Sequence, residues 1–356
     1  MPTRGPFLAR LARYGFPALL VATPPGTLAS RPGTPSPLPS AAGPLALWIA
    51  SRPHLGPNTL GSFGTSPARL SSFGRFVAFL VSGDWEAARA LAPSLNYDVA
   101  AIDDGGARYV AAFDRSGRDA TVVVSLAPVR DVVFEAPHVP FEAGTAEEAM
   151  ELLHRSGGRA ALVSGAHRCA SMTFAGCSGT TDVCGRSEAY RDSDVGHYAG
   201  TLFQVAHQTL AALWPRSVAV SLHGMRDDAE GVRTSLIVSS GAHGADLGMT
   251  LPATRLRAWL GRFPSTDGTV VSCNHPPDDR YGYRRLCGFT NVQGRFANGS
   301  LDICSASAET ATGRFIHLEQ DWTVLRPFAE DWRNISRYPF AMSLVQGIIA
   351  VTPPAR

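Results

Sequence analysis

Short apolar runs between turn residues alternate along the chain with stretches whose apolar residues recur at helical spacing. The runs predict strands over residues 97–112, 120–126, 131–134, 159–165, 217–225, 234–241, 269–272 and 314–319. The stretches predict helices loosely over 45–91, then over 145–157, across the stripe at 202–213, and over 253–260. Because strands alternate with helices, we expect an α/β fold of three layers, a mixed sheet with helices on both faces.

Turn and capping residues set the expected ends of these elements. The run Asp103-Asp-Gly-Gly predicts a hairpin within the first apolar segment. Thr145 and Glu148 have the spacing of a capping box, which opens a helix. Asp192-Ser-Asp194 predicts the N-cap of the helix that carries the apolar stripe, with Asp194 and His197 in its first turn.

The chain is expected to have three regions. Residues 1–44 read as a signal peptide or a disordered Pro/Ser-rich tail, because basic residues precede a short apolar run and a small-residue stretch near Ser30. Residues 45–126 read as an N-terminal accessory segment with a hairpin, and 127–356 as the domain that holds the candidate chemistry. Export to the periplasm or the extracellular space is the preferred interpretation, with a cytoplasmic protein as the alternative.

Composition supports a folded protein and excludes several function classes. Hydrophobic residues make up 45% of the 356 residues and charged ones 17%, which is a folding composition. The net charge is only +2 and no basic run occurs, so we expect no nucleic-acid partner. No apolar stretch reaches the ~20 residues of a transmembrane helix. All 32 basic residues are Arg, which removes lysine Schiff bases and a P-loop lysine from consideration.

Six cysteines, an even number, suggest disulfides in an exported protein. Cys177 and Cys184 flank one polar loop, and Cys273 and Cys287 flank another, so each pair resembles a disulfide that closes a loop. The connectivity stays open at this stage, as does the alternative of ordinary thiols in a cytosolic protein.

Four chemically active side chains fall at or just past the ends of predicted strands: His138, His167, His223 and Glu319. In α/β sheets, ligands bind beyond the carboxyl ends of the strands. These side chains therefore predict a site at one edge of the sheet.

His138, Glu142 and His223 form a candidate metal site. Two imidazoles and one carboxylate make a zinc set that leaves a fourth position open for water, as in catalytic zinc sites. One zinc per chain would lower the pKa of that water to about 7 and polarise a carbonyl oxygen. Glu319 would then serve as the general base.

Short motifs in the same order occur in a known family. They are Ala136-Pro-His138, Gly165-Ala-His167-Arg168, His197 and His207, Leu222-His-Gly-Met225, and Phe315-Ile-His-Leu-Glu319 followed by Leu325-Arg326. Over roughly residues 132–326 the chain resembles the N-formylglutamate amidohydrolase-like zinc hydrolases. The stretch from His138 to Thr145 is similar to the poly-gamma-glutamate hydrolases, which share a carboxypeptidase-like fold with them.

The resemblance implies metal ligation by His138, Glu142 and His223 and a catalytic carboxylate at Glu319. The sequence departs from the pattern at Gly224, where the amidohydrolases more usually carry Ser, and in the spacing of Glu142 from His138. The Cys-rich segment 169–184 matches neither pattern.

Polar residues outside the candidate metal set are expected to bind substrate, to support the ligands or to have structural roles. Arg168, Arg295 and Asn291 are candidates to bind a substrate carboxylate, because a guanidinium recognises it bidentately, with structural arginines as the alternative. Asp194 and His197 are expected to lie behind the metal ligands and support them. His207 reads as a core histidine, and His154, His243 and His275 as exposed or loop residues.

The sequence therefore predicts a zinc-dependent hydrolase that cleaves an amide bond in a small acidic or peptide-like substrate. One alternative is a non-catalytic, disulfide-stabilised binding module on the same scaffold. Another is a zinc deacetylase or esterase, since an open zinc site serves several acyl transfers. The oligomeric state stays open.

Overall fold

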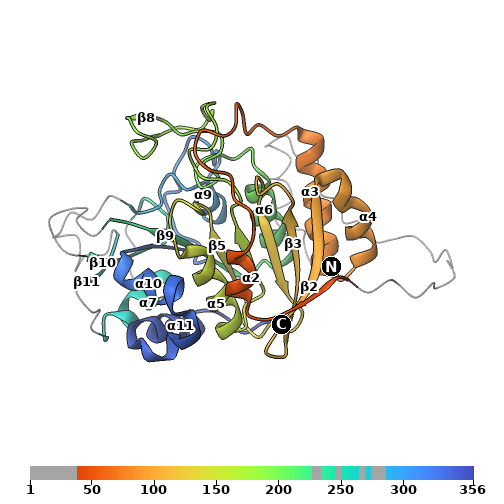
Figure 1. The fold of residues 1–356 in the computed structure, drawn as a ribbon. Helices are drawn as coiled ribbons and strands as arrows, with labels where there is room; N and C mark the ends of the chain where they lie inside the picture. The colour runs from red at the N-terminus through yellow and green to blue at the C-terminus, as the bar shows by residue number, and fades with distance from the viewer. Residues whose placement is uncertain (1–37, 227–233, 245–249, 264–268, 274–285) are drawn as a thin grey trace, which may run out of the picture.

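A ten-stranded mixed sheet runs through the protein (Figure 1). The computed structural model describes residues 38–226, 234–244, 250–263, 269–273 and 286–356, so the predicted signal peptide core and His275 lie outside the described residues. The strand order is β1-β2-β3-β4-β6-β5-β9-β12-β10-β11. Their bounds are β1 Ser40–Ala42, β2 Tyr97–Asp104, β3 Ala107–Asp114, β4 Thr121–Ser125, β5 Val132–Ala136, β6 Ala160–Val163, β9 Val218–Gly224, β10 Thr234–Ser239, β11 Thr269–Ser272 and β12 Phe315–Gln320.

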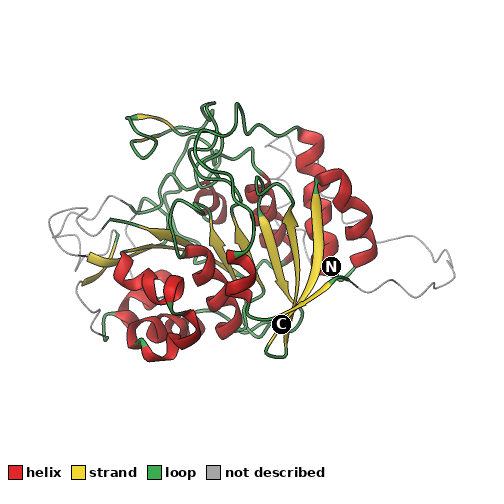
Figure 2. Ribbon diagram, viewed as in Figure 1, coloured by secondary structure: helices red, strands yellow, loops and turns green. Residues whose placement is uncertain are grey.

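Helices cover the sheet, which confirms the predicted mixed α/β class (Figure 2). They are α2 Leu45–Ala50, α3 Pro67–Ser82, α4 Trp85–Leu95, α5 Thr145–Ser156, α6 Leu202–Leu213, α7 Pro252–Leu260, α9 Val292–Ala297, α10 Trp322–Glu330, the 3-10 helix η2 Trp332–Arg337 and α11 Pro339–Val351. No helix within the described ranges has both the length and the apolar character needed to cross a membrane.

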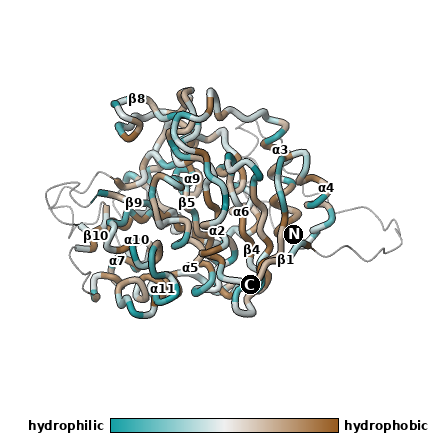
Figure 3. The backbone as a smooth tube through the Cα atoms, in the orientation of Figure 1, coloured by the Kyte–Doolittle hydropathy of each residue, from teal (hydrophilic) through white to brown (hydrophobic). Residues whose placement is uncertain are grey.

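The apolar residues of the central strands alternate between two large clusters. Phe134 and Val220 pack with α5, α10 and α11 in one cluster, whereas Val133 and Leu162 pack with α3, α4 and α6 in the other. This alternation follows from the period of two along a strand, which sends neighbouring side chains to opposite faces. Figure 3 shows hydrophobic stretches along these strands between the helices.

The N-terminal segment is continuous with the rest of the sheet. Strands β2 and β3 form the predicted hairpin, with Asp103 opposite Arg108, and β4 pairs with β6 of the following region. The expected boundary at residue 127 therefore lies between two strands of one sheet, β4 and β5.

One predicted cap and one predicted helix start are wrong, although α5 begins at the expected residue, Thr145. Helix α5 begins after Gly144, whose φ of 91° is readily adopted only without a Cβ, and no capping box forms. Helix α6 begins at Leu202, with the Thr201 side chain accepting from the Gln204 amide, so Asp194 precedes the helix by several residues. Both acidic residues, Glu148 and Asp194, are thereby released from capping and point into the interior.

Three disulfides connect all six cysteines: Cys169–Cys184, Cys177–Cys304 and Cys273–Cys287. The predicted Cys273–Cys287 loop closure is confirmed. The Cys177–Cys184 pairing is wrong, because Cys177 instead joins a loop 127 residues away. Tertiary contact between distant loops determines this pairing, which loop length cannot indicate.

Glu148 is buried on α5, where it accepts a hydrogen bond of 2.7 Å from Gln320 Nε2. Burial raises the pKa of Glu148 to about 8, and the hydrogen bond offsets only part of this. The folded state thus binds this proton more tightly than the unfolded chain. Its contribution to stability is complete below the unfolded pKa and is lost as the pH rises through the folded pKa.

Replacing Glu148 with Gln should remove this pH dependence. The quantity to compare is the decrease in the free energy of unfolding between pH 5 and pH 7. We expect this decrease to be about 2 kcal/mol smaller in Glu148→Gln than in the unsubstituted protein. Urea unfolding at both pH values measures the difference. The same change at exposed Glu86 is the control, and equal pH slopes for all three proteins would contradict the assignment.

Candidate metal centre

Loops gather at the edge where the central parallel strands end (Figure 2). Strands β5, β6, β9 and β12 run parallel, so their carboxyl ends meet at this edge. A cavity of about 880 Å³ opens there. His138, Glu142, His223 and Glu319 line it, together with residues 180–183 and Tyr190 from the disulfide-linked segment 169–190, which includes β7 (Thr180–Thr181) and β8 (Glu188–Ala189). Three of the four predicted strand-end side chains, His138, His223 and Glu319, therefore line one cavity, and His167 is not part of its lining.

His138 and Glu142 come from one turn of chain after β5. The Glu142 amide donates to the His138 carbonyl at 3.0 Å, and this turn brings the two side chains together. Glu142 Oε1 lies 2.8 Å from His138 Nδ1, while Glu142 Oε2 accepts from the Gly224 amide at 3.1 Å. The carboxylate is thereby fixed between the loop and the end of β9.

His223, at the end of β9, completes a set of three converging donor atoms. Its Nδ1 lies 3.1 Å from His138 Nδ1 and 3.3 Å from Glu142 Oε2. Two imidazole lone pairs repel at such a distance unless a proton or a cation lies between them. All three side chains are buried, so water does not screen this repulsion.

The donor set fits a tetrahedral metal ion. Bonds of 2.0 to 2.2 Å at tetrahedral angles separate ligand atoms by about 3.3 to 3.6 Å. The observed separations of 2.8 to 3.3 Å require only a small expansion. Imidazole nitrogens with a carboxylate oxygen are typical zinc ligands, and all three side chains line the cavity.

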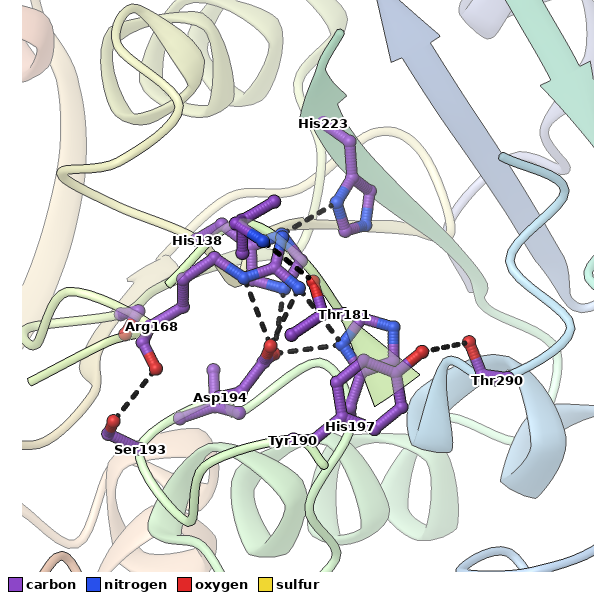
Figure 4. Close-up of polar contacts among 12 residues, drawn as sticks. His138, Arg168, Thr181, Tyr190, Ser193, Asp194, His197, His223 and Thr290 are labelled. Carbon is purple, nitrogen blue, oxygen red and sulfur yellow. Dashed lines mark hydrogen bonds and ion pairs between the residues drawn. The ribbon is translucent and has the colours of Figure 1, made fainter. Parts of the chain in front are cut away.

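Asp194 lies behind this set and holds three side chains (Figure 4). Its Oδ2 accepts from Arg168 Nε at 3.0 Å and Nη2 at 2.6 Å. Its Oδ1 accepts from His138 Nε2 at 3.0 Å and His197 Nδ1 at 2.8 Å. A carboxylate that binds the far nitrogen of a ligating histidine fixes its tautomer and orientation. His138 thus presents its Nδ1 lone pair to Glu142 and His223.

Gly196 makes this arrangement possible. A Cβ at this position would lie 2.7 Å from His138 Nε2, too close for any side chain. The chain between Asp194 and His197 can therefore pass beneath His138 only with glycine here.

Burial and the neighbouring carboxylate or imidazole charges shift the pKa values of the three side chains in opposite directions. Burial raises the pKa of Glu142, but the neighbouring His138 and His223 more than offset this and bring it well below its usual range. Burial lowers the pKa of His223, which favours the neutral ring that a metal requires. Burial also lowers the pKa of His138, yet the Glu142 and Asp194 carboxylates raise it overall.

Glu319 lies at the end of β12, beside His223 in the parallel register. It lines the cavity, and His317 Nε2 lies 3.7 Å from its Oε1. Burial, and then the charge of Glu142, raise the pKa of Glu319 well above its usual range. A carboxylate with a raised pKa and access to the cavity has the properties of a general base.

The remaining predicted site residues divide into two groups. Arg168 lines the cavity; its Nε and Nη2 donate to Asp194 Oδ2, and its Nη1 lies 3.6 Å from Glu142 Oε1. Arg295 donates to the carbonyls of Phe289 and Cys304, and Asn291 caps α9, so neither lines the cavity. Arg295 supplies donors to backbone carbonyls of neighbouring loops, and the Asn291 side chain accepts from the Gly294 amide at the start of α9.

Three further histidines have the expected environments. His207 is buried in α6, where its Nδ1 lies 2.6 Å from Glu135 Oε1. His154 is partly exposed on α5, and His243 is exposed in a loop.

Among the cavity-lining residues that were not predicted, two have rings that stack on histidines of the site. His317 stacks on His223 with ring centroids 4.4 Å apart, and Tyr190 stacks on His197 at 4.0 Å. His317 and Glu319 are two apart on a strand and share a face, which was the available indication. Tyr190 belongs to the disulfide-linked segment, where no strand or helix pattern points to the cavity.

Comparisons with known proteins give no family assignment. No family model matches the chain, and no curated protein matches it. A solved bacteriophage poly-gamma-glutamate hydrolase is similar at 14% identity and a TM-score of 0.33, covering 66% of this chain and 88% of its own. A metallo-carboxypeptidase from Burkholderia cenocepacia is similar at 10% identity and a TM-score of 0.32, covering 65% of this chain and 59% of its own. Likeness at this level assigns neither family nor activity.

Proposed function

We propose that this protein is a zinc-dependent hydrolase that cleaves an amide bond in a small acidic or peptide-like substrate. The convergence of His138 Nδ1, His223 Nδ1 and the Glu142 carboxylate within 3.3 Å of one another carries the proposal. A non-catalytic binding module has no need for buried donors to converge, nor for Glu319 beside them in the same cavity.

The chain's own residues support a hydrolytic reaction. A zinc ion held by His138, Glu142 and His223 would lower the pKa of a bound water to about 7 and polarise the substrate carbonyl. Glu319 takes up the proton from the attacking water and returns it to the leaving amine.

Arg168 is placed to assist the same step. Its Nη1 lies 3.3 Å from His138 Nδ1, beside the converging donors, while Asp194 holds the rest of the guanidinium. The fixed charge stabilises the negative charge that develops on the carbonyl oxygen.

Three disulfides in the described residues are consistent with an exported protein, and we propose a periplasmic or extracellular location.

Metal content tests the proposed site directly. We expect elemental analysis of the full chain, prepared without a His tag or added metal, to find about one zinc per molecule. The His138→Ala/His223→Ala variant should lose it, and His154→Ala/His243→Ala, changed outside the cavity, should retain it. Zinc-loaded protein is then assayed on N-acyl amino acids and γ-glutamyl peptides. Absence of metal, together with no change in Tm on zinc addition, would overturn the proposed function.

A further inference from the structure

His197 holds a fixed position at the cavity wall. Its ring stacks on Tyr190 with centroids 4.0 Å apart and planes 10° apart. On the other side it lies parallel to His138 at 5.6 Å. Tyr190 is itself held by Thr290, whose Oγ1 lies 3.2 Å from the phenolic oxygen. The ring plane is therefore set before any substrate enters.

The hydrogen bond to Asp194 determines which nitrogen of His197 carries the proton. The Asp194 carboxylate only accepts, so His197 Nδ1 at 2.8 Å must donate. Arg168 Nη2 also approaches this nitrogen, but at 3.5 Å, and it already donates to Asp194 Oδ2 at 2.6 Å. The ring is thus the Nδ1–H tautomer, with a lone pair on Nε2.

The lone pair on Nε2 has no partner within the part of the chain that the structure describes. Figure 4 shows this nitrogen on the side of the ring away from Asp194. His197 lines the cavity, and its side chain is 13% exposed. A fixed acceptor at the wall of a cavity is matched by a ligand that brings an N–H or O–H donor.

We propose that His197 Nε2 accepts a hydrogen bond from the N–H of the substrate and makes the site selective for amides over the corresponding esters. This inference rests on the proposed function, because it assigns the substrate group recognised beside the metal centre. An ester has oxygen in place of the N–H and would leave the acceptor unpaired. Sites built to bind such a donor discriminate strongly against analogues that lack it.

Two substitutions distinguish the two roles of His197, which are to accept a hydrogen bond from the substrate at Nε2 and to donate one to Asp194 from Nδ1. In His197→Asn the amide nitrogen can still donate to Asp194, but no acceptor reaches the Nε2 position. In His197→Gln the longer side chain can present its oxygen near that position. We expect His197→Asn to lose about 3- to 10-fold in kcat/KM on N-acetyl-L-glutamate. It should change less than about 2-fold on the ester analogue 2-acetoxyglutarate, and His197→Gln should recover part of the amide rate.

A second measurement does not depend on turnover. The ¹⁵N resonances of the histidine rings in the full chain, assigned with His197→Gln, should show Nδ1 protonated and Nε2 unprotonated. Binding of N-acetyl-L-glutamate or γ-L-glutamyl-L-glutamate should shift the Nε2 resonance of His197, and 2-acetoxyglutarate should not.

These experiments distinguish an error about the role of His197 from an error about the proposed zinc-dependent hydrolysis. The opposite tautomer, an equal loss on amide and ester, or the absence of an amide-induced shift overturns the role of His197. If zinc is bound and neither compound is hydrolysed, the proposed reaction on these substrates fails. The ¹⁵N measurement then decides the role of His197 by itself.

Discussion

Glu319→Gln is expected to lower kcat by about 10²- to 10⁴-fold while zinc stays bound. Glutamine preserves the shape of the side chain at the end of β12 but cannot take up a proton from water. Because Glu319 is not among the three converging donors, the metal content should not change. Steady-state kinetics on a hydrolysed amide, with elemental analysis of the same sample, measures both quantities.

A matched control comes from Glu135, which is also a buried glutamate near a strand end but lies outside the cavity beside His207. Glu135→Gln should alter stability and leave kcat nearly unchanged. Near-normal turnover by Glu319→Gln would show that another group is the base.

Asp194→Ala should destabilise the protein by about 3 to 5 kcal/mol, because it leaves the buried Arg168 guanidinium without its main partner. Asp194 accepts two hydrogen bonds from Arg168 and one each from His138 and His197. Zinc affinity should also fall by about 10- to 100-fold, since His138 loses the contact that fixes its orientation. Urea unfolding and zinc titration against a chelator measure the two effects.

Asp98→Ala provides the control. Asp98 also receives two hydrogen bonds from one arginine, Arg115, but this pair is exposed. Its removal should cost much less stability than the removal of Asp194, because water screens an exposed ion pair. The double variant Arg168→Leu/Asp194→Leu removes both charges and should recover part of the stability lost in Asp194→Ala. If Asp194→Ala and Asp98→Ala were equally stable, Asp194 would not hold the site together.

Local pattern determined most of the secondary structure. Strands such as β5 and β9 are short apolar runs, and α6 carries an apolar stripe. The pattern of a few neighbouring residues is therefore enough to predict each element. Their order along the chain also placed His138, His223 and Glu319 at one edge, because parallel strands end together.

The sequence alone did not determine which polar groups meet behind the ligands. Asp194 has the residue type of a helix cap, yet α6 starts at Leu202 and Asp194 instead joins Arg168, His138 and His197. His197 lies three residues along the same turn, but Arg168 and His138 come from separate loops, so no spacing along the chain encodes those two contacts. The same reason applies to Cys177, which forms a disulfide with Cys304, 127 residues further along the chain.

The sequence by itself thus determined the α/β class, the strand-end histidines and the His138–Glu142 spacing, since these depend on residues close together in the chain. The tertiary structure alone decided that His223 meets them, that Arg295 supports a loop and that His197 lines the cavity. Those outcomes depend on how loops that follow different strands pack at one edge of the sheet. Buried polar groups need hydrogen-bond partners, and this packing decides which partners lie within reach.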